Sequence, residues 1–183
     1  MSGQKQHVDA FRKLALRRQL LRGVSPGAAY VPFCGDGDVA VELYADRRVL
    51  AADLDPARVA TCSARLDDAD VRVADCDGWP FPDSDEVFAV ADFDSYAYPY
   101  DSFRAFWTNT KKADRVVLFF TDAQKQAIVR SGYAHLPDGT PLVTRGMTAN
   151  ARRPYFNFWY LRHCVPWLKA AVDPHKVLKV RCY

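Results

Sequence analysis

Five short apolar runs, each followed by a turn or by a helix-forming segment, constrain the fold of this chain most strongly. They lie at residues 28–33, 48–52, 71–74, 87–91 and 115–121. The last of them, RVVLFFT, is apolar at successive positions, as a strand is when both faces of its sheet are covered. Strands that alternate with helices form parallel sheets joined by α/β crossovers. We therefore expect an α/β fold with a mostly parallel sheet and helices on both of its faces.

Segments with helical signals precede, separate and follow these runs. They lie at residues 7–22, 39–44, 56–66, 102–109 and 122–131. In the first of them, Phe11, Leu14, Ala15 and Leu21 fall on one helical face, with arginines and Lys13 around them.

The chain after residue 131 has a different character. Residues 135–154 are polar, with turn signals at residues 137–139, which predicts a loop. Residues 155–172, YFNFWYLRHCVPWLKAAV, are typical of an aromatic-rich helix with a kink near Pro166. Most of its large rings must be buried, and we expect this of Phe158, Trp159 and Trp167. Residues 175–183 predict a final strand.

No domain boundary is visible in the sequence. We expect a single domain over residues 1–183, with a basic helix in residues 1–27 and a basic, aromatic-rich part in residues 122–183. The composition is that of an ordinary globular protein, 49% hydrophobic and 26% charged. No apolar run is long enough to span a membrane, and the N-terminal residues lack the apolar region of a secretory signal. A cytoplasmic protein without a membrane partner is the expectation.

Cysteine and histidine spacing argues against a metal site. The five cysteines contain no C-x-x-C pair, and the four histidines are scattered. We therefore expect neither a disulfide framework nor a bound metal.

Charge is distributed unevenly along the chain. Residues 51–102 carry three basic and 13 acidic residues, whereas residues 103–183 carry 14 basic and four acidic residues. Residues 1–22 are also basic, with six basic residues and one acidic residue. Such asymmetry indicates a ligand or partner that is itself locally charged, although mixed charges can also simply solvate a surface.

Glycines and acids follow three consecutive predicted strands. Gly35 and Gly37 lie between the first strand and a helix, where they allow a close approach of backbone to ligand or a tight turn. Asp53 ends the second strand and Asp75 the third, and an acid at such an edge can accept both hydroxyls of a ribose. Asp36, next to Gly37, would repel a pyrophosphate but tolerate a cation. This acidic edge favours S-adenosylmethionine, with its sulfonium and ammonium groups, over a dinucleotide.

Residues 28–121 resemble the class I S-adenosylmethionine-dependent methyltransferases, which have a Rossmann-like fold. The stretch VPFCGDGD is similar to the DPFCGSGT-type loop of nucleic-acid amino-methyltransferases, ADLDP to the ribose motif and ADCDGWPF to the adenine motif. The resemblance implies a set of residues that bind S-adenosyl-L-methionine: Phe33, Gly35, Asp36, Gly37, Asp53, Asp75, Cys76 and Asp92. The chain departs from the family at Val31, where an acid is expected before Pro32.

The fourth predicted strand ends in DFDSYAYP, at the place of the family's catalytic motif. This stretch resembles the D-x-D-P-F-G-x-P motif of tRNA guanine-N2 methyltransferases, with Ser95 in place of the first proline and Ala97 in place of the glycine. The match covers only eight residues.

The chemistry of methyl transfer to an amine would explain why these residue types lie here. A carboxylate that accepts N–H hydrogens turns the lone pair of an amine toward the methyl donor and stabilises the developing charge. We expect Asp94 in this role, Tyr96 as a ring stacked on the base, Asp92 as a bridge to the cofactor and Pro99 as a rigid element of the loop. The alternative is that the tyrosines only pack and that the aspartates cap the helix near residue 102. Asp101 is better placed as that cap.

The basic, aromatic C-terminal part suits a polynucleotide, RNA more than DNA. We expect Arg145, Arg152 and Arg153 to contact phosphates, and Tyr98 to contact the substrate. The sequence thus indicates methylation of an exocyclic amino group of a nucleic acid base. Two alternatives stay open: a small-molecule methyltransferase with a pocket of tyrosines 96, 98 and 100, and a non-catalytic module that binds the cofactor or RNA.

Overall fold

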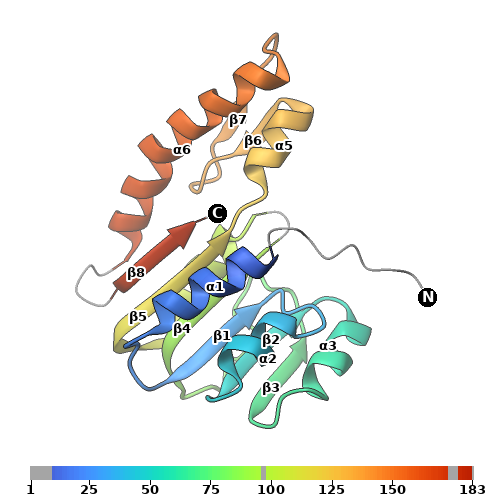
Figure 1. The fold of residues 1–183 in the computed structure, drawn as a ribbon, viewed down its shortest axis with the longest axis vertical. Helices are drawn as coiled ribbons and strands as arrows, with labels where there is room; N and C mark the ends of the chain where they lie inside the picture. Colours follow the sequence, from blue (N-terminus) through green and yellow to red (C-terminus); the bar gives the residue numbers. More distant parts are fainter. Residues whose placement is uncertain (1–9, 96–97, 173–176, 183) are drawn as a thin grey trace.

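A single parallel sheet forms the centre of the molecule. The computed structural model describes residues 10–95, 98–172 and 177–182, the last of these ranges by its backbone alone. The sheet has six strands in the order β3-β2-β1-β4-β5-β8, and all neighbouring pairs are parallel (Figure 1). The strands are β1 (Ala28–Pro32), β2 (Val49–Asp53), β3 (Ala69–Val73), β4 (Val87–Asp94), β5 (Lys111–Thr121) and β8 (Val177–Cys182).

Helices cover both faces of this sheet. One face is covered by α1 (Ala10–Leu21), α2 (Asp38–Tyr44) and α3 (Pro56–Ser63). The other face is covered by α4 (Tyr100–Asn109) and α6 (Ala149–Ala171). Alternation along each strand divides the core accordingly: Tyr30 and Phe93 pack on the α4 side, whereas Ala29 and Val31 pack on the α2 side. The expected Rossmann-like α/β fold with helices on both faces is confirmed.

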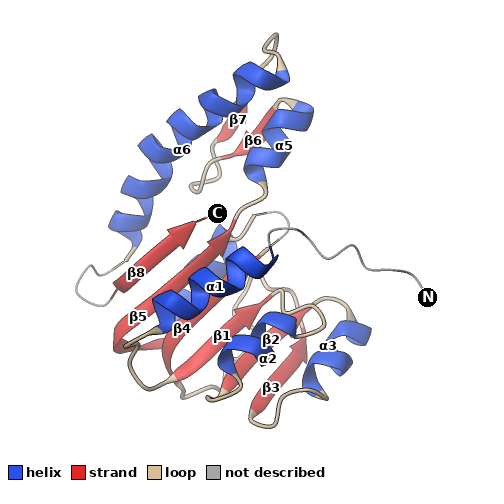
Figure 2. Cartoon of the chain, in the orientation of Figure 1, coloured by secondary structure: helices blue, strands red, loops and turns tan. Residues whose placement is uncertain are grey.

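A smaller unit lies beyond the end of β5. It consists of α5 (Gln124–Ser131) and a hairpin of β6 (Tyr133–His135) and β7 (Pro141–Val143), which stands apart from the central sheet (Figure 2). The expected loop over residues 135–154 is therefore wrong in part, since it contains the end of β6, all of β7 and the start of α6. The hairpin strands have only three residues each, but Ala134, Leu136 and Leu142 turn inward onto a separate small core.

The first helix packs differently from its sequence pattern. Phe11 is 75% exposed and Ala15 is also exposed, while Arg17 is fully buried against β4. The apolar face that the sequence indicates is therefore not the buried face of α1. A pair of ionic hydrogen bonds, described below, explains why an arginine takes the buried position.

Candidate functional site

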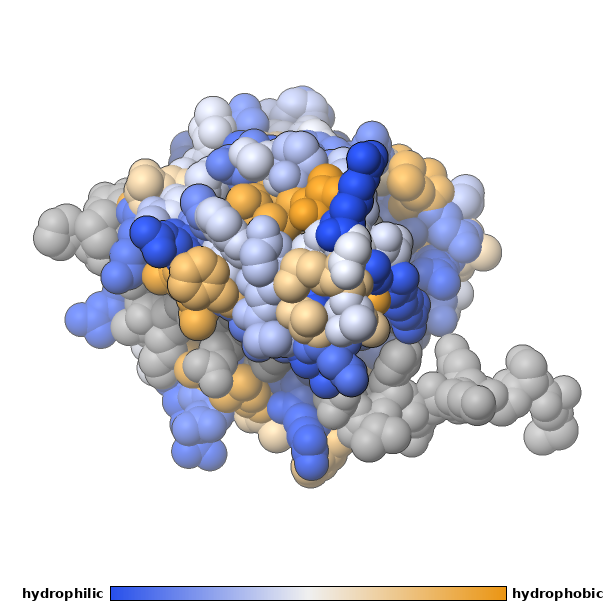
Figure 3. Space-filling view, turned by 90° about the horizontal axis from the view of Figure 1, so that it is seen from above, coloured by the Kyte–Doolittle hydropathy of each residue, from blue (hydrophilic) through white to orange (hydrophobic). Residues whose placement is uncertain are grey.

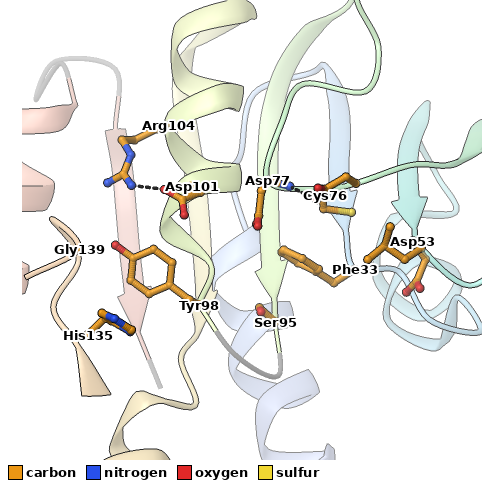
Figure 4. Close-up of a pocket in the computed structure, with 12 residues that line it drawn as sticks. Phe33, Asp53, Cys76, Asp77, Ser95, Tyr98, Asp101, Arg104, His135 and Gly139 are labelled. Carbon is orange, nitrogen blue, oxygen red and sulfur yellow. Dashed lines mark hydrogen bonds and ion pairs between the residues drawn. The ribbon is translucent and has the colours of Figure 1, made fainter. Parts of the chain in front are cut away.

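A cavity of about 560 Å³ lies at the carboxyl ends of the first four strands. Its wall combines residues that follow β1 to β4, the start of α4, and the hairpin (Figure 4). These residues are Phe33, Asp53, Leu54, Asp75, Cys76, Asp77, Ser95, Tyr98, Asp101, Arg104, His135 and Gly139. Four sequence-predicted cofactor residues, Phe33, Asp53, Asp75 and Cys76, thus come together in one place.

The turn after β1 is fastened to the end of β2 by Asp53. One oxygen of this carboxylate accepts the Gly35 backbone N–H at 2.9 Å, and the other accepts that of Asp55 at 3.0 Å. Gly35 has φ 53°, and a Cβ on it would meet no atom within 4 Å. Phe33, with φ 59°, is the one non-glycine residue of positive φ in the described part of the chain. Strain of this kind gathers at ligand-binding sites.

Gly37 has a structural reason of its own. With φ 85°, a Cβ at this position would lie 2.9 Å from the Cys62 sulfur in α3. The glycine therefore lets the turn pack against α3, which is a different task from contact with a ligand. Asp36 does not line the cavity, and its backbone carbonyl accepts a hydrogen bond from Arg65 at 2.7 Å.

The turn after β3 contributes two acids and a thiol. Asp75 accepts the backbone N–H of Asp77 at 3.0 Å. Burial raises the pKa of the Cys76 thiol to about 11, so that it is neutral and unsuited to act as a nucleophile. Burial and the neighbouring charges of Asp75 and Asp101 raise the pKa of Asp77.

Acids dominate the charge of the cavity. Its lining contains four aspartates, Asp53, Asp75, Asp77 and Asp101, against the one guanidinium of Arg104. Arg104 forms an ion pair with Asp101. Such a lining repels a phosphate and accommodates a cationic ligand with hydroxyl groups.

The hairpin forms the wall at one end of the cavity. The Tyr98 hydroxyl lies 3.1 Å from the Leu136 carbonyl and donates to that of Pro137 at 2.7 Å. Arg104 donates to the same Pro137 carbonyl at 2.9 Å. The connection between β6 and β7 is therefore held against α4, and this brings His135 and Gly139 into the wall.

The structure places Asp92 away from this cavity, contrary to the expected role as a bridge to the cofactor. Its carboxylate accepts from Arg17 Nε at 2.6 Å, from Arg17 Nη2 at 2.7 Å and from the Tyr44 hydroxyl at 2.7 Å. Successive residues of a strand point to opposite faces, so Asp92 lies on the α1 side while Phe93 lies on the α4 side. Its carboxylate is thus engaged with α1 and α2 on that side of the sheet.

Asp94 points to the same face of the sheet but sits closer to the surface. Its side chain is 25% exposed and accepts from Lys13 Nζ at 3.1 Å, with Arg17 Nη2 at 3.6 Å. Burial alone would raise the pKa of Asp94, but Arg17 and Lys13 hold it below the ordinary value. Asp94 is therefore an ionised carboxylate at the end of β4. Its neighbour Ser95 lines the cavity, whereas Asp94 itself does not.

The other residues of the expected catalytic stretch have varied positions. Tyr96 lies outside the described residues. Pro99 is the N-cap of α4, which begins at Tyr100, so Asp101 lies in the first turn and not at the expected cap. Tyr100 is fully buried and donates to Asp122 at 2.8 Å, which removes it from the tyrosine pocket of the small-molecule alternative.

The three arginines expected to contact phosphate do not line the cavity. Arg145 and Arg153 are exposed, whereas Arg152 is half-buried and donates to the Val129 carbonyl at 3.3 Å. Its guanidinium also fills the space beside Gly132. Arg152 thus joins α6 to α5. Seen from above, the molecule carries strongly hydrophilic residues at several places, with separate hydrophobic groups between them (Figure 3).

Several residues of the cavity wall were not predicted from the sequence, and some of them carry no sequence signal. Asp77 lies in the same ADCDGW stretch as Asp75 and could have been found there. His135 and Gly139 reach the cavity because the hairpin is held against Tyr98 and Arg104 at the start of α4, and no sequence signal marks that contact. Among the described residues, no group of three or more acids, cysteines or histidines is arranged to hold a metal ion. Likewise, no described helix combines the length and apolarity needed to cross a membrane.

Comparison with known proteins finds only partial structural likeness. No family model matches the chain, and no curated protein matches it. A proposed methyltransferase from Bacillus halodurans is similar over 55% of this chain and 47% of its own, with 19% identity and a TM-score of 0.45. A geranyl diphosphate C-methyltransferase from Streptomyces coelicolor, in complex with S-adenosyl-L-homocysteine, is similar over 61% and 50%, with 19% identity and a TM-score of 0.44.

A further partial match has the same character. It is an S-adenosylmethionine-dependent methyltransferase from Thiobacillus denitrificans, similar over 44% of this chain and 35% of its own, with 20% identity and a TM-score of 0.36. The chain therefore spans half or less of the length of these three proteins. Likeness of this degree concerns part of an α/β sheet and carries no assignment of function.

Proposed function

We propose that this protein is an S-adenosylmethionine-dependent methyltransferase whose cofactor binds in the cavity at the carboxyl edge of the sheet. The observation that carries the proposal is the meeting of Asp53 and Asp75, from neighbouring strands, with Phe33 and Cys76 in one acidic cavity. Asp53 would accept the ribose hydroxyls, and Asp75 would lie near the adenine amino group. The open space beside Gly35 leaves room for the methionyl part.

Charge supports this ligand over a phosphate-containing one. Four carboxylates face the cavity, and its single cation is already paired with Asp101. When bound, S-adenosylmethionine would supply an electrophilic methyl group, and its positive charges would find carboxylates around them. Asp36 is not needed in this arrangement, because its side chain lies outside the cavity wall.

For the substrate, we propose an exocyclic amino group of a nucleic acid base, with RNA preferred. The base would enter at the Ser95–Tyr98 end of the cavity. Asp94 is the remaining candidate to accept the amine hydrogens, since it is ionised, partly exposed and next to Ser95 of the cavity wall. In this role its carboxylate would have to turn from Lys13 on the α1 side toward the substrate. Arg145 and Arg153, both exposed, would contact phosphates outside the cavity.

Calorimetry with S-adenosyl-L-homocysteine tests the cofactor assignment. We expect binding by the parent protein and its loss in Asp53→Ala. Asp46→Ala is the matched control, because Asp46 is an exposed acid that follows α2 and pairs with Arg47 at the opposite edge of the sheet. Absence of binding at millimolar ligand, or equal binding by Asp53→Ala, would rule out this cofactor site.

One observation favours a second candidate, a small-molecule methyltransferase. Tyr98 and Arg104 hold the hairpin against α4, which adds His135 and Gly139 to the wall at the substrate end. Ionic strength separates the two candidates. Binding of RNA should weaken steeply between low and moderate salt, whereas binding of a small neutral substrate should hardly change.

A further inference from the structure

One side of α6 carries an exposed apolar stripe. Phe158 is 54% exposed, Leu161 is 67% exposed and Val165 is 38% exposed. The expectation that Phe158 belongs to the core is therefore wrong. The inward face of α6 is already occupied, since Phe156, Cys164 and Leu168 are buried. The stripe adjoins this buried face, since Leu161 and Leu168 are seven residues apart and project in nearly the same direction, and it continues the apolar surface of α6 into solvent.

The stripe has the spacing of a helix–helix seam. Its members follow one another at intervals of three and four residues, as the a and d positions of a coiled coil do. At 3.6 residues per turn, the three side chains fall within about 60° of arc. An interfacial helix on a membrane presents a much broader apolar face, of about 100° or more. The narrow stripe therefore fits one partner helix better than a lipid surface.

Positive charge borders the stripe on one side. Arg162 and Lys169 follow Phe158 and Val165 by four residues each, and α6 contains no aspartate or glutamate. No ion pair among the described residues engages either of them. The Arg162 guanidinium instead lies 5.7 Å from the centre of the Phe158 ring.

We propose that this face of α6 is a docking surface for an amphipathic helix of a partner protein, whose apolar seam is bordered by aspartate or glutamate. Charges that flank a seam select the partner, and acids opposite Arg162 and Lys169 would satisfy both. A second copy of α6 would instead bring like charges together. Nucleic acid would gain nothing from Leu161 and Val165, which neither stack on bases nor form hydrogen bonds. The proposal is independent of the function assigned to the cavity.

Two designed peptides test it by fluorescence anisotropy. Both have leucine at the a and d positions, and they carry either glutamate or lysine at the flanking positions. We expect the glutamate peptide to bind at least about tenfold more tightly than the lysine peptide. Leu161→Gln should weaken that binding about tenfold or more. Phe11→Gln is the control, because it removes an exposed apolar side chain on α1, and it should leave the binding of the glutamate peptide unchanged. Arg162→Glu should reduce or reverse the preference between the peptides.

The opposite results are equally clear. Failure of the glutamate peptide to bind at millimolar concentration would overturn the proposal, as would equal binding of the two peptides. It would also fall if Leu161→Gln abolished self-association, measured by sedimentation, or binding to phosphatidylserine vesicles or to a single-stranded RNA. Those outcomes would assign the stripe to a second copy, a membrane or the nucleic acid, respectively.

Discussion

At the scale of single residues, Arg17 and Asp92 show what the sequence conceals. An acid after a buried strand is a reasonable candidate for ligand binding, and this is why Asp92 was expected to reach the cofactor. The Asp92 side chain turns toward α1 and not toward the cavity, because its cationic partner, Arg17, lies there, 75 positions earlier in the chain. Arg17 takes the buried position of α1 because Asp92 accepts its hydrogen bonds. This pairing does not appear in the spacing of apolar residues along the sequence, so it could not be predicted from that pattern.

Removal of one member of this pair should be costly. Both side chains are fully buried, so Arg17→Met would leave the Asp92 carboxylate with Tyr44 and without its cation. We expect the free energy of unfolding to fall by about 3 to 5 kcal/mol, measured by urea denaturation. The control is Arg18→Met, since Arg18 forms a half-exposed ion pair with Glu42, and it should cost under about 1 kcal/mol. Equal effects of the two substitutions would contradict the buried network.

Asp122 gives a prediction about pH. Burial, the largest cause, raises its pKa from 3.8 to about 6, although Gln124 and Tyr100 donate hydrogen bonds to it. Between these two pKa values the folded protein holds a proton on Asp122 that the unfolded chain has lost. The free energy of unfolding therefore falls as the pH rises through this range. Asp122→Asn should therefore gain stability relative to the parent between pH 4 and pH 7, by up to about 3 kcal/mol. Denaturation at the two pH values measures this, and a constant difference would disprove it.

At the scale of elements, the order of strands and helices in the first 121 residues could be predicted from the sequence. Apolar runs, turn glycines and acids at strand ends are local signals, and they place Asp53 and Asp75 at one edge. The face of α1 and the hairpin could not be predicted in this way. Arg17 depends on a distant partner, and the two hairpin strands are too short for their alternation to stand out.

The hairpin's attachment to α4 can be tested at Tyr98. Tyr98→Phe removes the hydroxyl that reaches the Leu136 and Pro137 carbonyls. We expect hydrogen exchange in β6 and β7, including the Leu136 amide, to accelerate about tenfold, as loss of a bond to buried carbonyls should allow. The amides of β1 should be unaffected. Tyr133→Phe, which removes an exposed hydroxyl near His135, is the control. Unchanged exchange in the hairpin would show that these bonds do not hold it.

At the scale of the whole molecule, the sequence's charge asymmetry becomes a division of space. The acidic middle of the chain supplies the cavity, whereas Arg145 and Arg153 of the basic part are exposed outside it. This arrangement would let one region hold a cationic cofactor and another attract phosphates. Arg152, which joins α6 to α5, shows that a basic count alone does not identify a contact surface.

Salt dependence tests this division. We expect the Arg145→Ala, Arg153→Ala double variant to bind a single-stranded RNA oligomer more weakly. The slope of log K against log salt should fall by about 0.7 for each phosphate that the protein no longer neutralises. Arg48→Ala is the control, because Arg48 lies before β2 and pairs with Asp68. A slope equal to that of the parent would exclude Arg145 and Arg153 from RNA binding.

Methyl transfer is the most direct test of the proposed function. The protein is incubated with S-adenosylmethionine labelled in its methyl group and with total RNA or DNA, and the nucleic acid is digested to nucleosides. We predict label in a nucleoside methylated on its exocyclic amine, in RNA above DNA, and no label with Asp53→Ala. If the parent protein binds the cofactor but labels neither nucleic acid nor a small-molecule extract, the chain is not a methyltransferase, and its cavity serves binding alone.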